Sequence, residues 1–298
     1  MVMKARILIL LLVVSTICKA QNLKYAITNT VSGGMQAGII AFINNPKPKC
    51  FLNAFWKGCI GGSLNYAGKR LIEQSAMNNN FNLIWPARIV NSLGSSMVYN
   101  GSLNKGLLSS FTMNLYFLNM QFDGSFKFRI DPYTLGSAAI LSLNRNNYFE
   151  AIKSLQTGSI VFCKKKDISG NGDLGQNFGN SMVYKIFPQY KYDFYGNSTM
   201  VNNSSIQIVC HELIHGMQYE QFRSFDLITT HKIKLLHNIN RYVVLSPGFG
   251  LLYLGANLKG CYNNFFENEA DYFGNSNLIN SAMRHILFRP NPDSRKWN

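Results

Sequence analysis

The chain has 298 residues, of which 47% are hydrophobic, 13% aromatic and 14% charged. This much apolar and aromatic material excludes an intrinsically disordered chain and is sufficient for a sizeable core. The 29 basic and 14 acidic residues give a formal net charge of +15, which favours anionic partners such as phospholipids, cell-wall polymers or acidic peptides. No recognition-helix, RNP or zinc-finger pattern accompanies the scattered basic residues, so nucleic-acid binding is not expected.

The N-terminus has the pattern of a signal peptide. Lys4 and Arg6 precede an apolar run at residues 7–17, which is shorter than the roughly 20 apolar residues that a transmembrane helix needs. Small residues follow at the positions that a signal peptidase inspects. We therefore expect residues 1–20 to be removed by cleavage after Ala20, and the mature protein to be exported to the periplasm, the outer envelope or the medium.

Attachment to a membrane by another route is the alternative to simple export. A lipid anchor on Cys18 would replace cleavage, although Ile17 is bulky where lipoprotein signals have a small residue. Later apolar segments at 31–43 and 243–258 are shorter than a transmembrane helix requires and contain glycine or proline. We therefore expect residues 21–298 to form one domain without a transmembrane span, which contacts at most an anionic envelope surface.

Five cysteines would remain after cleavage: Cys50, Cys59, Cys163, Cys210 and Cys261. Export permits disulfides, but the odd number leaves at least one thiol unpaired, and no CxxC spacing occurs. Buried single cysteines are therefore expected, and a Cys50–Cys59 disulfide stays open as an alternative.

Residues 31–112 are expected to be mainly helical. The pattern predicts a helix at 31–44, a second at 50–77 after a Pro-Lys-Pro turn, and a third that opens at Trp85. The first two helices carry glycines four positions apart: Gly34 and Gly38, and Gly58 and Gly62. Glycines at this spacing share one helix face and let backbones approach closely, which predicts antiparallel packing of the two helices. A membrane-inserted hairpin is the alternative, which charged side chains in the second helix weaken.

The middle of the chain is expected to contribute a small, mainly antiparallel sheet. Two strands are predicted within 114–130, around the hairpin signal Asp123–Gly124. In the second of these strands, three apolar residues alternate with polar ones and are expected to face the core: Phe126, Phe128 and Ile130. A further strand is predicted at 159–163, the glycine-rich residues 167–181 are expected to form a loop, and residues 182–195 are expected to be partly extended.

An HExxH motif lies in a helix predicted at 205–222. His211 and His215 are four positions apart, so both imidazoles lie on one helix face and can reach the same metal ion. Glu212 is rotated by about 100° from its neighbour, which places it beside the attacking water rather than among the ligands. Zn²⁺ accepts imidazole ligands and keeps an open position when it is catalytic. The alternative interpretation is a buried helix in which the two histidines are only hydrogen-bonded.

A cluster of acidic residues follows in a helix predicted to begin near residue 263. Glu267 and Asp271 are four positions apart, so one can complete a His₂Glu site while the other accepts a hydrogen bond from a ligand imidazole. Glu269 points about 200° away from Glu267 and would act alone. Glu267 is therefore the predicted ligand, and loss of Glu269 is expected to leave zinc binding nearly normal. An exposed acidic turn is the alternative interpretation.

The two motifs together resemble the gluzincin metallopeptidases, in particular the CAAX prenyl protease group and bacterial domains with HExxH and ExxAD motifs. The resemblance implies that His211, His215 and Glu267 bind zinc, that Glu212 is the general base and that Asp271 supports a ligand. It covers only the C-terminal part of the chain. The prenyl proteases are multi-span membrane proteins, and this chain lacks those spans, so their substrate class does not carry over.

The residues before these motifs, at 21–200, resemble exported bacterial proteins. The whole sequence predicts an α+β, zincin-like fold, with a helical N-terminal part and with a small sheet and two metal-binding helices in 111–298. The expected function is that of an exported zinc metallopeptidase or peptide-bond amidohydrolase that uses metal-activated water, with Glu212 as the base. Arg284 and His285 are candidates for stabilising the oxyanion. The alternative is a non-catalytic envelope protein that keeps the helix pair for structure and binds anionic surfaces.

Overall fold

A computed structural model describes residues 20–164, 175–185, 188–192, 198–202, 205–230, 232–245, 252 and 265–274. In these parts the chain is a mixed α+β protein in which helices predominate, so the expected α+β class is confirmed. The predicted signal peptide lies outside the described residues, apart from Ala20. Cys18, within that signal peptide, therefore lies outside them, and so do Cys261, Arg284 and His285.

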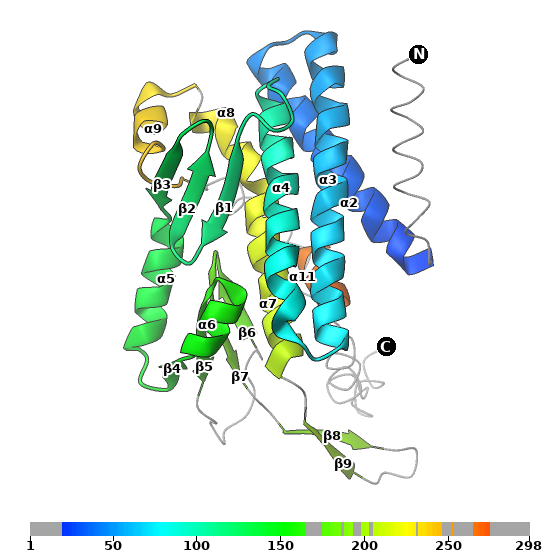
Figure 1. The fold of residues 1–298 in the computed structure, drawn as a ribbon, viewed down its shortest axis with the longest axis vertical. Helices are drawn as coiled ribbons and strands as arrows, with labels where there is room; N and C mark the ends of the chain where they lie inside the picture. Colours follow the sequence, from blue (N-terminus) through cyan, green and yellow to red (C-terminus); the bar gives the residue numbers. More distant parts are fainter. Residues whose placement is uncertain are drawn as a thin grey trace, which may run out of the picture.

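Three long helices form the N-terminal part of the molecule: α2 (Ala20–Asn44), α3 (Pro48–Met77) and α4 (Ile84–Ser102). Short connections join them, including the 3₁₀ turn η1 (Phe81–Leu83), and α3 and α4 lie side by side in Figure 1. The predicted helical region is confirmed, although α2 begins at Ala20 rather than near residue 31. Pro48 occupies the first turn of α3, where its missing N–H would have had no partner in the helix.

The apolar stretch of α2 is longer than the one expected at residues 31–43. Residues Leu23–Asn44 are long and apolar enough to cross a membrane, judged by length and composition alone, and 56% of the apolar window is buried inside the protein. The core helix of a soluble protein and an N-terminal signal sequence both pass this test of length and composition. The exposed side of α2 carries a stripe of large apolar side chains: Ile27, Val31, Met35, Ile39, Phe42 and Ile43.

The glycines of α2 and α3 lie where the two helix backbones meet. A Cβ atom on Gly33 would lie 2.5 Å from the carbonyl oxygen of Gly58 and 2.9 Å from the Cα atom of Gly62. Gly34 lies against Cys59 and Phe55 in the same way. Because no side chain fits between these backbones, the predicted close packing of the two helices is confirmed.

The first sheet is an antiparallel meander of β1 (Phe111–Leu115), β2 (Leu118–Phe122) and β3 (Phe126–Ile130). Met113 pairs with Met120, and Met120 pairs with Phe128. The predicted turn at Asp123–Gly124 is confirmed, and Gly124 has a φ of 91° that favours glycine. The region holds three strands where two were predicted, because the chain reverses a first time at Tyr116, whose φ is 52°.

β3 faces the opposite way from the prediction. Phe126 is 74% exposed, and Phe128 and Ile130 are exposed as well, whereas Arg129 is only 5% exposed. Arg129 donates hydrogen bonds to Asn119 Oδ1 and to the carbonyl oxygen of Asn240, so its charge is buried with partners. The inner face of this sheet is thus polar, and alternation alone could not say which of the two faces is inside.

The second sheet has the strand order β4-β5-β7-β6, with only the β5–β7 pair parallel. Its strands are β4 (Asn147–Phe149), β5 (Ile160–Lys164), β6 (Gly175–Phe178) and β7 (Ser181–Lys185), and α5 (Pro132–Leu143) and α6 (Ala151–Thr157) pack beside them. β6 falls inside residues 167–181, so the loop predicted there is corrected. Below it in Figure 1 lies the hairpin of β8 (Pro188–Tyr192) and β9 (Ser198–Asn202).

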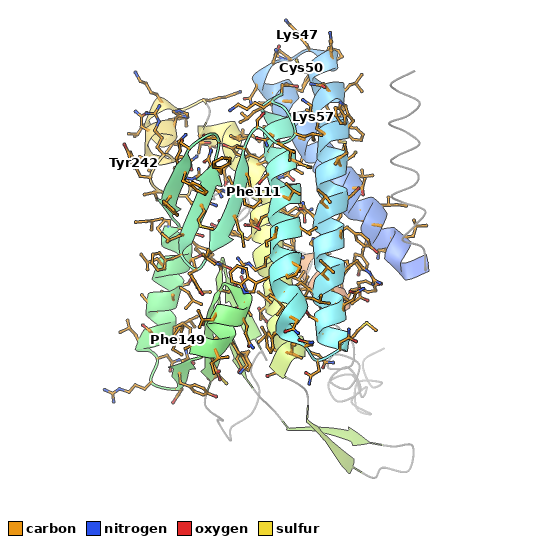
Figure 2. All side chains as sticks on the ribbon, viewed as in Figure 1. Lys47, Cys50, Lys57, Phe111, Phe149 and Tyr242 are labelled. Atoms are coloured by element: carbon orange, nitrogen blue, oxygen red, sulfur yellow. The ribbon has the colours of Figure 1, made fainter. Side chains whose placement is uncertain are left out.

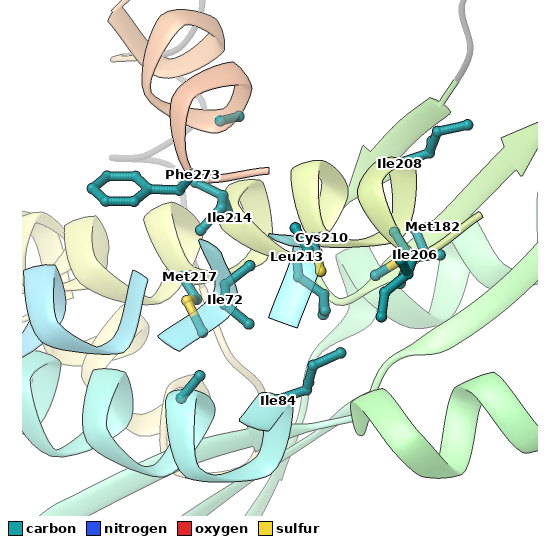
Figure 3. Packing of buried hydrophobic residues seen from close by; sticks show 14 of the residues in the cluster. Ile72, Ile84, Met182, Ile206, Ile208, Cys210, Leu213, Ile214, Met217 and Phe273 are labelled. Atoms are coloured by element: carbon teal, nitrogen blue, oxygen red, sulfur yellow. The ribbon is translucent and has the colours of Figure 1, made fainter. Parts of the chain in front are cut away.

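α7 (Ser205–Gln221) runs through the middle of the molecule, between α3, α4 and the second sheet. Figure 3 shows Leu213 and Met217 of α7 packed towards Ile72 and Ile84, with Phe273 on the other side of the helix. The chain continues through η2 (Phe222–Asp226), α8 (Leu227–Thr230) and α9 (Lys234–Ile239), and a further helix is α11 (Phe265–Phe273). Both helices predicted around the motifs are therefore present.

The four described cysteines are unpaired, and three of them are buried, as expected. The alternative of a Cys50–Cys59 disulfide is wrong, because both residues belong to α3. Nine residues of helix separate their Cα atoms by about 13 Å, which is beyond the reach of a disulfide. Figure 2 shows Cys50 near the first turn of α3, beyond Lys57 on the same helix.

Candidate metal centre

The candidate metal centre lies between α7 and α11. Four apolar residues of α7 face the core at helical spacing: Ile206, Cys210, Leu213 and Met217. This fixes the helix so that His211 and His215 face α11. The two helices are close at this point, since a Cβ atom on Gly274 would lie 2.8 Å from the Cα atom of His211. Glycine at the end of α11 therefore permits the approach.

Three potential ligand atoms converge there from His211, His215 and Glu267. The two Nε2 atoms of the histidines are 3.2 Å apart. Glu267 Oε2 lies 3.4 Å from Nε2 of His215 and 3.6 Å from Nε2 of His211. The carboxylate of Glu267 is the most exposed of the three groups, so the site opens to solvent beside it.

This arrangement fits a tetrahedral zinc ion. Ligand atoms about 2.1 Å from a tetrahedral ion lie about 3.4 Å from one another, and the three measured separations are 3.2, 3.4 and 3.6 Å. Two imidazoles and one carboxylate leave a fourth position open, which is the pattern of catalytic rather than structural zinc sites. The group could hold a metal ion, with two imidazoles and one carboxylate as the donor set.

Asp271 lies one helical turn after Glu267 and contacts the far side of His211. Its Oδ1 atom is 3.1 Å from Nδ1 of His211, so Nδ1 is the protonated nitrogen when the ring is neutral, and Nε2 points to the site. Burial lowers the pKa of His211, but hydrogen bonds with Asp271 and Glu267 and the charge of Glu212 outweigh burial and raise this pKa to about 10. The same carboxylates that stabilise an imidazolium would stabilise a metal cation.

Glu267 and Glu269 have opposite environments on α11. Glu267 reaches both histidines, whereas the Glu269 side chain is fully buried on the other side and pairs with Lys69 of α3 at 2.6 Å. The carboxylate beside the histidines is therefore that of Glu267, as the helix phase predicts. The contact of Glu269 with Lys69 was not predicted from the sequence.

Glu212 is buried beside the two histidines, and its charge contributes to the raised pKa of His211. Its carbonyl oxygen accepts a hydrogen bond from Asn177 Nδ2 of β6, at 2.9 Å. β6 is an edge strand of the second sheet among the described residues. A strand edge thus lies next to the HExxH helix.

The site also includes residues that sequence reasoning missed. Gln218 Oε1 lies 2.9 Å from His215 Nδ1, and Gln218 is in turn bonded to Glu269. Helical spacing carried a signal for Gln218, because it is three positions from His215 and shares its face. Asn29 of α2 donates to Glu269 Oε1 at 2.6 Å, and no signal in the sequence pointed to Asn29 or to Lys69 of α3.

A cavity of about 940 Å³ lies elsewhere, near the C-terminal ends of α2 and α4. His237 lines it, together with β3 and α9, and none of the HExxH residues does. It is therefore not part of the candidate metal centre.

Comparison of the chain with protein-family models, with curated proteins and with solved structures found no match.

Proposed function

We propose that this protein is an exported zinc-dependent hydrolase that cleaves peptide bonds or related amides. The observation that carries the proposal is the convergence of His211 Nε2, His215 Nε2 and Glu267 Oε2 at the separations expected around one zinc ion. The arrangement is zincin-like in three respects: two ligands lie on an HExxH helix, the third lies on a later helix, and a strand edge lies beside them.

The residues of the site have distinct roles in this proposal. When bound, the zinc ion supplies a Lewis acid that polarises the scissile carbonyl and lowers the pKa of water towards about 7. Glu212 accepts a proton from the attacking water and returns it to the leaving amine, since it is a buried carboxylate beside the ligands. Asp271 keeps Nε2 of His211 directed at the site.

β6 offers a binding surface for an extended peptide. Among the described residues it pairs with β7 on one side only, and its Asn177 contacts α7 at Glu212. A peptide that adds to such an edge makes main-chain hydrogen bonds irrespective of its sequence. A peptide or protein is therefore the substrate class that the surroundings of the site favour.

The test compares the wild-type protein with Glu212→Gln in hydrolysis of a mixture of fluorogenic peptides. The variant should retain zinc, because the ligands are unchanged, and should lose hydrolysis, because an amide cannot accept the proton. Glu150→Gln, in another part of the molecule, serves as the control and should remain active. Normal turnover by Glu212→Gln would rule out Glu212 as the base, and no turnover by the zinc-loaded wild type would favour the non-catalytic alternative.

A further inference from the structure

The second histidine of the HExxH motif is connected to a buried ion pair. Lys69 of α3 and Glu269 of α11 meet at 2.6 Å, and both side chains are completely buried. Lys69 Nζ also donates to Asn29 Oδ1 at 2.9 Å and to Gln221 Oε1 at 2.8 Å, so each of its three protons has an acceptor. Buried charges of this kind require complete pairing, and here the ammonium has it.

The carboxylate of Glu269 is equally well supplied with donors. Its Oε1 atom accepts from Asn29 Nδ2 at 2.6 Å, and its Oε2 atom accepts from Lys69 Nζ and from Gln218 Nε2, the latter at 2.9 Å. Each of these three side chains donates to it. The carboxylate is thus held as an acceptor in a fixed position within the helices.

This acceptor fixes the orientation of the Gln218 side chain. Gln218 Nε2 donates to Glu269 Oε2 and, at 3.0 Å, to the carbonyl oxygen of Phe266. Both partners can only accept, so both N–H groups of the amide are used there. A flipped amide would place its oxygen against two acceptors. Gln218 Oε1 must therefore face His215.

The orientation of Gln218 in turn decides the tautomer of His215. Gln218 Oε1 lies 2.9 Å from His215 Nδ1 and can only accept, so Nδ1 carries the proton of the neutral ring. The unprotonated nitrogen is then Nε2, which faces His211 and Glu267. His215 thereby obtains from Gln218 what His211 obtains from Asp271.

We propose that Glu269, held by Lys69, positions His215 for metal binding through Gln218. Gln218 and Glu269 are positioning residues, because neither touches the metal position. The inference rests on the proposed zinc site and replaces the expectation that loss of Glu269 leaves zinc binding nearly normal. It also gives the N-terminal helices a role in the site, since Lys69 belongs to α3 and Asn29 to α2.

The experiment compares Gln218→Leu with Gln221→Leu in zinc affinity, measured by competition with a chromophoric chelator. Both variants remove a buried amide of α7 from the same network, but only Gln218 contacts His215. We expect zinc to bind 10–100-fold more weakly to Gln218→Leu and nearly normally to Gln221→Leu. An equal effect of the two leucine variants, or none in Gln218→Leu, would overturn the proposal.

Glu269→Gln tests the outer part of the connection. The variant keeps the shape of the side chain, but only one of its two terminal atoms can still accept hydrogen bonds from Asn29, Lys69 and Gln218. Zinc should therefore bind more weakly to Glu269→Gln, as it should to Gln218→Leu. Wild-type affinity in Glu269→Gln would remove Glu269 from the proposal.

A second measurement separates this inference from the proposed function. Nitrogen-15 NMR of the metal-free wild-type protein, at a pH where His215 is neutral, reports which ring nitrogen carries the proton. We expect the proton on Nδ1. A proton on Nε2 would overturn the inference even if zinc binds. A wild-type protein that has the proton on Nδ1 and binds zinc but cleaves no peptide would contradict the proposed function and leave the positioning of His215 by Gln218 intact.

Discussion

At the scale of single residues, the assignment of the metal site depends most directly on the side chain of Glu267. Glu267→Ala removes one of three ligand atoms and should weaken zinc binding by more than the 10–100-fold that is typical of a lost supporting residue. Asp271→Ala removes only the hydrogen-bond partner of His211 and should stay within that range. Chelator competition measures both variants. Unchanged zinc affinity in Glu267→Ala would show that the third ligand is another group.

The buried pair of Lys69 and Glu269 leads to a prediction about stability. Lys69→Met leaves the Glu269 carboxylate buried without its cation and should lower the free energy of unfolding by about 3–5 kcal/mol. Lys127→Met is the matched control, because Lys127 pairs with Asp123 on the surface, where such a pair contributes only about 0.2–1 kcal/mol. Urea unfolding of the metal-free proteins gives both values. Similar losses in the two variants would contradict the importance of burial.

At the scale of elements, the contact between α2 and α3 depends on glycine. Gly33→Ala places a methyl group against the backbone of Gly58 and should destabilise the protein by about 1–3 kcal/mol, the usual effect of overpacking. Gly136→Ala in α5 has open space around the new methyl group and should stabilise the protein by about 0.5–1 kcal/mol through helix propensity. Thermal unfolding measures both. A neutral Gly33→Ala would mean that the helices are further apart.

Because β3 buries Arg129 rather than its apolar residues, the structure predicts mutational effects opposite to those expected from the sequence pattern. Phe126→Lys should change the free energy of unfolding by less than about 0.5 kcal/mol, because the ring is exposed. Arg129→Met should destabilise the protein, because it leaves the acceptor Asn119 Oδ1 without the donors of the guanidinium. Urea unfolding decides between the two orientations. A large loss in Phe126→Lys together with a neutral Arg129→Met would restore the orientation predicted from the sequence.

The elements differ in how far the sequence could predict them, for physical reasons. The helices around HExxH and around Glu267 follow from local periodicity, and helix phase alone separates Glu267 from Glu269. Alternation in β3 identified a strand but not its buried face, because that face depends on polar partners in β2 and after α9. β6 was missed because its glycine and asparagine residues are typical of loops, and its pairing with β7 is a tertiary effect.

At the scale of the whole molecule, the N-terminal helices and the motif helices form one unit around the site. Lys69 belongs to α3, and its contacts extend to α2, α7 and α11. Pairs so far apart in sequence leave no local pattern, so nothing in the sequence connects the helical region with the metal site. The exported location remains a proposal that rests on the N-terminal pattern.

Zinc binding should also affect the stability of the whole molecule. An ion that binds the folded chain but not the unfolded chain stabilises it by about 2.7 kcal/mol at a free concentration of 100 times its Kd. We therefore expect zinc to raise the thermal midpoint of the wild type and to leave that of Glu267→Ala almost unchanged. Magnesium, which prefers oxygen ligands, should have little effect on either protein. Equal shifts by zinc in both proteins would indicate binding at another site.

The zinc content of the purified full chain, measured by native mass spectrometry, tests the assignment of the zinc site most directly. We expect one zinc ion per chain in the wild type, retained in Glu212→Gln and lost in a variant in which His211 and His215 are both replaced by alanine. A wild-type protein that is metal-free and cannot be loaded with zinc, or a double variant that still holds one zinc ion, would contradict it.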